Sequence, residues 1–110
     1  KAVAEKTAAD NAFTAKRDDL TKALADSNTK AKNANNDLAA TKGGLAKQLA
    51  TVELNKDDGS SQAKKRVIEA SEKVGVLNQQ ANHHERNLNE LEARKKTAQE
   101  ALDAHLKTRL

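Results

Sequence analysis

The sequence predicts an all-α protein, an antiparallel two-helix coiled-coil hairpin in the form of an elongated rod. Large apolar residues are scarce, since only 19 of 110 residues are Leu, Ile, Val or Phe and Phe13 is the single aromatic residue. That bulk is too small for a globular core, whereas a seam between two helices needs far less. Low hydrophobicity also fits a disordered chain. A net charge of only +4, the absence of proline and the 21 alanines favour helices instead.

The first predicted arm, residues 1–55, carries apolar or small residues every three or four positions. Read back from the centre of the chain, this series is Val52, Gln48, Leu45, Thr41, Leu38, Ala34, Ala31, Ser27, Leu24, Leu20, Arg17 and Phe13. Toward the N-terminus the seam also takes in Lys6 and Asp10, which are poor seam residues. We therefore expect this end of the hairpin to fray unless flanking sequence completes it.

The segment 56–62 (KDDGSSQ) is the predicted turn. Asp58-Gly59 is typical of a turn, and Ser60 or Ser61 can cap the helix that follows. The segment is short enough to reverse the chain direction, which predicts antiparallel neighbours.

The second predicted arm, residues 63–110, repeats the pattern in the forward direction. Its seam series is Val67, Ala70, Val74, Leu77, Ala81, His84, Leu88, Leu91, Lys95, Ala98, Leu102 and His105. Arg109, at the end of the arm, is again a poor seam residue.

The two series share one register. For a turn centred near Gly59, the numbers of facing residues should sum to about 119. The predicted facing pairs are Val52 with Val67, Leu45 with Val74, Leu38 with Ala81, Ala31 with Leu88 and Leu20 with Ala98. Several pairs set a large residue against a small one, so that side chains can interdigitate across a close seam.

Three glycines lie at one level of this hairpin, Gly43 and Gly44 in the first arm and Gly75 in the second. Each costs about 0.5–1 kcal/mol relative to alanine inside a helix. We interpret this level as a hinge. Close packing of the two helices, or a tolerated local weakness, are the alternatives.

The tip of the hairpin is the candidate partner-binding site. It holds Lys56, Asp57 and Asp58 in the turn, followed by Lys64, Lys65 and Arg66. Three cations in the first turn of a helix are unusual, because the helix dipole disfavours positive charge there. An acidic group on a partner would explain them, and so would a solvated surface without a partner.

Other functional classes find little support in the sequence. No nucleophile–base pair, glycine-rich phosphate loop or carboxylate pair predicts catalysis, so we expect no enzyme and no cofactor. The adjacent His83 and His84 point about 100° apart on a helix and cannot chelate one ion together, so no metal is expected. Cations and anions alternate without a one-sided basic face, which argues against nucleic acid. No run is apolar enough for membrane insertion.

Two stretches, 32–40 (KNANNDLAA) and 94–104 (RKKTAQEALDA), resemble the long helical hairpins of colicin-like bacteriocins in composition. That resemblance covers most of the chain and contains no diagnostic motif. It implies a receptor-contacting tip, a bacterial parent protein and a secreted or extracellular location. The chain departs from the family at the tip, where bulky residues are replaced by Asp-Asp-Gly-Ser-Ser. The hairpins of bacterial efflux and secretion adaptor proteins are a second similar class, with tip contacts that this chain lacks.

Three functional hypotheses remain. The first is a rigid spacer or display rod within a larger, bacterial protein, of which this chain, lacking methionine, would be a fragment. The second is a binding module for a protein partner or receptor, contacted at the tip or along an asparagine-rich flank. The third is self-association into a four-helix bundle. Off-seam apolar residues favour this homo-oligomer, namely Leu49, Leu54, Ile68, Val76 and Leu106. The cellular compartment is not indicated.

Overall fold

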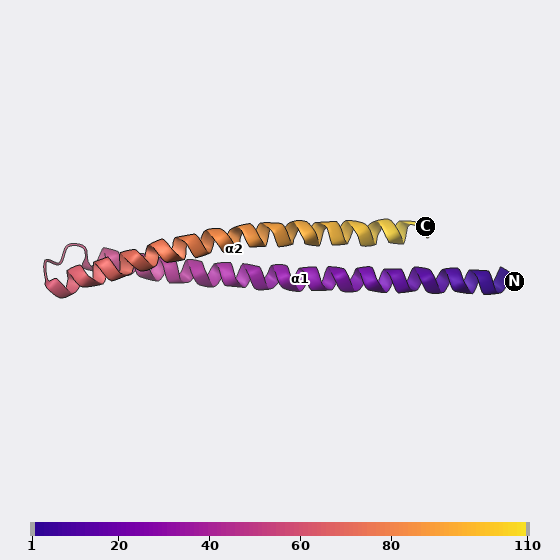
Figure 1. Ribbon diagram of the computed structural model, residues 1–110, viewed down its shortest axis with the longest axis horizontal. Coiled ribbons are helices and arrows are strands. Elements are labelled where there is room, and N and C mark those ends of the chain that lie inside the picture. The colour runs from indigo at the N-terminus through magenta and orange to yellow at the C-terminus, as the bar shows by residue number, and fades with distance from the viewer. Residues whose placement is uncertain (1, 110) are drawn as a thin grey trace. The chain divides into compact units, whose positions relative to one another are not determined.

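Two long helices make up the fold. The computed structural model describes residues 2–109, in which α1 spans Ala2–Asn55 and α2 spans Ser61–Lys107 (Figure 1). No strand occurs between residues 2 and 109. The prediction of an all-α antiparallel helical hairpin is confirmed. The reversal occupies residues 56–60 and is slightly shorter than the predicted 56–62, because α2 begins at Ser61. Neither of these helices is long and apolar enough to cross a membrane.

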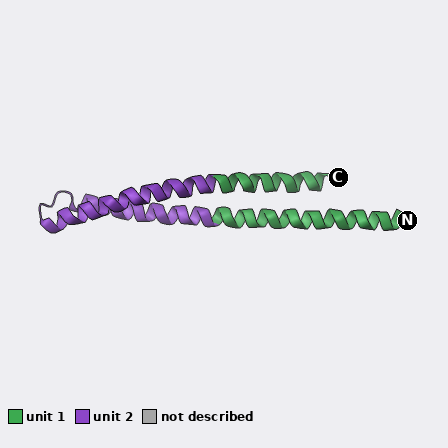
Figure 2. Ribbon diagram, viewed as in Figure 1, with its two compact units in different colours: residues 1–32, 90–110 green, residues 33–89 purple. Residues whose placement is uncertain are grey.

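The chain divides into two compact units (Figure 2). Unit 2 comprises residues 33–89 and contains the turn with the helical segments on either side of it. Unit 1 comprises residues 1–32 and 90–110, and thus joins the first part of α1 to the last part of α2. In each unit the core is one seam between two antiparallel helical segments.

The seam of unit 2 follows the predicted register. Ala34, Leu38, Ala63 and Ala70 are buried. The remaining predicted seam residues of this unit are half-buried, namely Thr41, Leu45, Gln48, Val52, Val67, Val74, Leu77, Ala81, His84 and Leu88. The seam also extends one step closer to the turn than predicted, through half-buried Asn55 and through Ala63, which is only 1% exposed. Small residues at these positions let the helix backbones approach closely next to the turn.

The seam of unit 1 departs from the prediction at four charged residues, all of them exposed, namely Lys6, Arg17, Lys95 and Arg109. Leu20, Leu24, Ser27, Ala31, Leu91, Ala98 and Leu102 are buried or half-buried as expected. Arg17 and Lys95, which the heptad placed in the seam, are exposed. Their side chains turn toward solvent, where Arg17 pairs with Asp18 at 3.3 Å and Lys95 with Glu92 at 3.9 Å. A long aliphatic stem allows a charged group to leave a seam position in this way.

A cluster of four side chains joins the two helices near the last turn of α2, where the sequence predicted fraying. The His105 ring stacks on the Phe13 ring with centroids 4.3 Å apart, and its Nε2 donates to the Phe13 carbonyl oxygen at 2.9 Å. The Arg109 guanidinium lies 4.6 Å from the centre of the Phe13 ring and contacts Asp10 at 2.6 Å. We call Asp10, Phe13, His105 and Arg109 the terminal cluster. Residues 2–9 of α1 lie beyond it and are exposed.

Candidate partner-binding tip and glycine level

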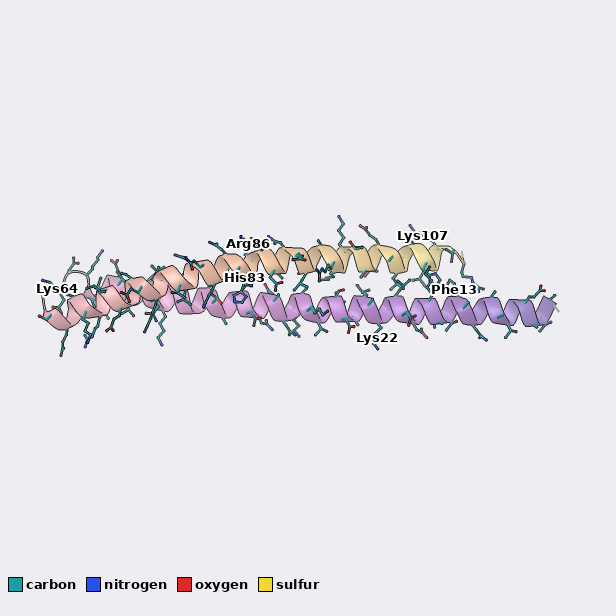
Figure 3. The ribbon with its side chains drawn as sticks, in the orientation of Figure 1. Phe13, Lys22, Lys64, His83, Arg86 and Lys107 are labelled. Atoms are coloured by element: carbon teal, nitrogen blue, oxygen red, sulfur yellow. The ribbon has the colours of Figure 1, made fainter. Side chains whose placement is uncertain are left out.

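Both candidate sites from the sequence lie in unit 2, the tip at the turn and the glycine level within the paired helices. Figure 3 shows Lys64 near the turn and His83 farther along α2. The tip is built by local hydrogen bonds, which leave some of its charged groups engaged and others free.

Asp58 and Ser60 hold the turn. The Asp58 backbone N–H donates to the Asn55 carbonyl oxygen at 3.2 Å, and Asp58 Oδ1 accepts from the Ser60 backbone N–H at 2.9 Å. Ser60 Oγ in turn accepts from the Ala63 N–H at 3.1 Å. Ser60 is thus the N-cap of α2, one of the two caps that the sequence allowed. The Asp58 carboxylate closes the turn by accepting a hydrogen bond from the backbone N–H of Ser60, two residues on.

The same contacts explain the electrostatics of Asp58. Hydrogen bonds from the Ser60 backbone and hydroxyl, aided by the Arg66 charge, lower the pKa of Asp58 below its ordinary value of 3.8 despite a small opposing effect of desolvation. A carboxyl with a lowered pKa in the folded state stabilises the fold above its unperturbed pKa. That contribution is lost as the pH falls through the lowered value. Asp58 therefore acts within the turn, whatever it contacts outside it.

The cations of the tip differ in their partners. Lys56 Nζ forms an ion pair with Glu53 at 2.9 Å, within α1. Within the described range 2–109, Lys64, Lys65 and Arg66 have no salt-bridge partner within 4.0 Å. The helix dipole at the start of α2 disfavours these three positive charges. They leave a local excess of positive charge on the first two turns of α2.

Exposed apolar side chains flank the turn, which the sequence analysis did not assign to the tip. Leu54 is 84% exposed and Ile68 is 60% exposed. Ile68 borders a shallow depression whose other lining residues are Asn55, Lys56, Asp57, Asp58, Gly59, Lys64 and Val67. The signal in the sequence was the position of both residues outside the heptad seam and close to the polar break.

The exposed apolar residues do not form one stripe. In the heptad that the seam defines, Leu49 and Ile68 fall on one flank of the two-helix seam, and Leu54 and Val76 fall on the opposite flank. A four-helix bundle needs a continuous apolar face on each helix pair. This division weakens the bundle hypothesis relative to the other two.

The glycine level lies within unbroken helix. Gly43, Gly44 and Gly75 are all helical, and none of them has a positive φ. A Cβ atom added at Gly43 or Gly75 would meet nothing within 4 Å, and one at Gly44 would lie 3.8 Å from the two Leu77 methyl carbons, an ordinary contact. Close packing, one of the alternatives for these glycines, therefore does not require any of them.

Other chemistry-bearing side chains do not converge. The His83 and His84 ring centroids are 5.7 Å apart, with His83 exposed and His84 half-buried in the seam. Among residues 2–109, no group of three His, Cys, Asp or Glu side chains could hold a metal ion. Over the same range, no polar or charged side chain is fully buried. The described surface offers shallow depressions along the helices and at the turn.

Comparison of the chain with protein-family models, with curated proteins and with solved structures found no match. The colicin-like resemblance thus stays a prediction. The function is argued below from the helices and their contacts.

Proposed function

We propose that this chain is a non-enzymatic spacer, a helical hairpin that holds other parts of a larger protein at a set distance. The observation that carries this proposal is the placement of the apolar residues. Within residues 2–109, every buried side chain lies in the seam between α1 and α2. The large apolar residues of the chain serve to pair two long helices. A spacer needs such pairing, whereas a globular enzyme needs a filled core.

The two ends of the hairpin suit this role. The terminal cluster joins the last turn of α2 to α1 through Phe13 and His105, and residues 2–9 of α1 extend beyond it. The turn lies in the other unit, at the end of a continuous α1. Because α1 is unbroken from Ala2 to Asn55, one continuous helix would connect a domain preceding it to the turn.

Distance measurement tests the spacer. The described residues contain no cysteine, so Lys16→Cys with Asp57→Cys, both at exposed sites, accepts a donor and an acceptor dye. Helical rise over the intervening residues predicts a mean separation of about 60 Å. Single-molecule energy transfer should show one population with that mean separation, unchanged by salt. A broad distribution that shortens continuously with decreasing urea would contradict the spacer.

A second candidate function is recognition of a protein receptor by the tip, as the colicin-like resemblance implies. Two observations favour it, namely the positive charge of Lys64, Lys65 and Arg66 without ion-pair partners in residues 2–109, and the exposed Leu54 and Ile68 beside the turn. An exposed apolar side chain thus lies on each flank of the seam beside the turn, next to free cations. Interfaces commonly combine such groups, with the apolar contacts central and the charges at the rim.

The tip hypothesis predicts a charge-specific loss of binding. Replacing Lys64, Lys65 and Arg66 by alanine should reduce binding of the dye-labelled chain to intact Gram-negative cells at least tenfold, since the tip would lose its free cations. The matched control replaces Lys95, Lys96 and Lys107 by alanine, which removes the same charge from exposed sites in unit 1. Equal binding by the parent chain and both variants would rule out the tip.

A further inference from the structure

We propose that the glycine level of unit 2 is a joint, at which α1 and α2 bend or open together. Gly43 and Gly44 in α1 and Gly75 in α2 would let the segment that carries the turn move relative to residues 33–40 and 78–89. This inference goes beyond the spacer proposal, because it makes one level of the hairpin mechanically distinct from the rest.

The three glycines weaken both helices, and no neighbouring atom is close enough to require a residue without a side chain. Glycine has the lowest helix propensity after proline, because it loses the most backbone freedom on folding. All three positions are helical, and the space around Gly43 and Gly75 is open to 4 Å. A side chain would fit at each site. The helices are therefore weak at this level, although no contact there requires glycine.

At this level, the α1 side of the seam has no fully buried apolar side chain. The buried residues of α1 in unit 2 are Ala34 and Leu38, which lie before the glycines. Thr41, Leu45 and Gln48 follow, all only half-buried and two of them polar. Apolar burial holds a coiled coil together, so the seam resists separation less here than at Ala34 and Leu38.

Polar contacts between α1 and α2 do not hold the described part of unit 2 together. Among the described residues of unit 2, no side-chain hydrogen bond or ion pair joins α1 to α2. Thr41, two residues before Gly43, bonds within α1 instead, and its Oγ1 donates to the Asp37 carbonyl oxygen at 2.9 Å. Back-bonding of this kind slightly destabilises and bends helices.

The surface beside the glycine level leaves space for the helices to bend. An open, mainly apolar hollow lies along α2 at this level, lined by Glu72, Lys73, Val76, Leu77 and Gln80. Leu77 also borders Gly44, whose missing side chain leaves that flank of the seam thin. Bending at the glycines would therefore meet few atoms in its path.

Hydrogen exchange on the full chain tests the joint. Amides of residues 42–46 and 73–77 should exchange faster than amides of residues 34–38 and 81–85. In a variant with Gly43→Ala, Gly44→Ala and Gly75→Ala, exchange at the level should slow about tenfold relative to the parent chain, equivalent to ~1.4 kcal/mol. A control with Asn36→Ala and Asn82→Ala also replaces exposed residues by a better helix former, but away from the level. It should leave the fast exchange at the level in place.

A distance distribution gives an independent readout. Spin labels at Asn35→Cys and Glu53→Cys, both exposed, span the level within α1 at about 27 Å by helical rise. The distribution should narrow in the triple alanine variant and not in the asparagine control. Exchange at residues 42–46 and 73–77 that is no faster than at residues 34–38 and 81–85 overturns the joint, as does fast exchange at the level that the triple variant leaves unchanged. Either result would leave the Lys16-to-Asp57 distance intact, whereas failure of the spacer would shorten that distance in every variant.

Discussion

Leu38→Ala should lower the free energy of unfolding by about 2–3 kcal/mol, whereas Leu54→Ala should change it by less than about 0.5 kcal/mol. The two leucines belong to the same helix and unit, but Leu38 is 7% exposed in the seam and Leu54 is 84% exposed. Removing Leu38 takes away buried methyl groups and leaves a gap that two rigid helices close only in part. Leu54 has little buried surface to lose.

Urea unfolding followed by circular dichroism measures both effects. The two variants share one chemical change and one helix propensity difference, so Leu54→Ala isolates the contribution of the seam. The whole transition should move to lower urea in Leu38→Ala. Equal losses in the two variants would show that the seam does not hold unit 2 together.

Phe13→Ala should release the terminal cluster at a cost of about 1–3 kcal/mol, and the loss should be local to unit 1. Phe13 is the surface on which the other members assemble, because His105 stacks on its ring at 4.3 Å and Arg109 lies over it at 4.6 Å. Aromatic stacking contributes about 0.5–1.5 kcal/mol beyond area burial, and an exposed cation–π contact about 0.5–1 kcal/mol. The Asp10–Arg109 ion pair, being partly exposed, adds little by itself.

Hydrogen exchange separates this local effect from global unfolding. In Phe13→Ala, residues 10–20 and 98–107 should lose protection, while residues 63–74 of unit 2 keep theirs. Val3→Ala serves as the control, since Val3 is 80% exposed beyond the terminal cluster. A double-mutant cycle with His105→Ala should give a coupling of about 0.5–1.5 kcal/mol. A coupling near zero would mean that the stack does not stabilise this end.

The fold could be predicted because its information is local and periodic. Alternating steps of three and four residues place Leu45 and Val52 of α1, or Val67 and Val74 of α2, on one face of a helix. The polar break between the series then allows only a reversal. Antiparallel pairing follows, and the burial of Leu38 and Ala70 confirms that the two series form the seam.

The candidate sites were less accessible to prediction. The tip residues were found by their charges, but the engagement of Asp58 by Ser60 and the pairing of Lys56 with Glu53 depend on the conformation of the turn. Leu54 and Ile68 were noticed as off-seam residues, but the extent of their exposure, and the depression that Ile68 lines, required coordinates. The glycine level was found from the register, whereas its open surroundings required coordinates.

By itself, the sequence determined that this protein is a helical hairpin, where it turns, and which residues form the seam, because a helix repeats every 3.6 residues and imposes its period on the chain. Only the tertiary structure decided how the irregular positions are used. It turned Arg17 and Lys95 outward, and it closed the polar end through Phe13 and His105. Those choices depend on distances between side chains on different helices and on the flexibility of long side chains, neither of which the heptad records.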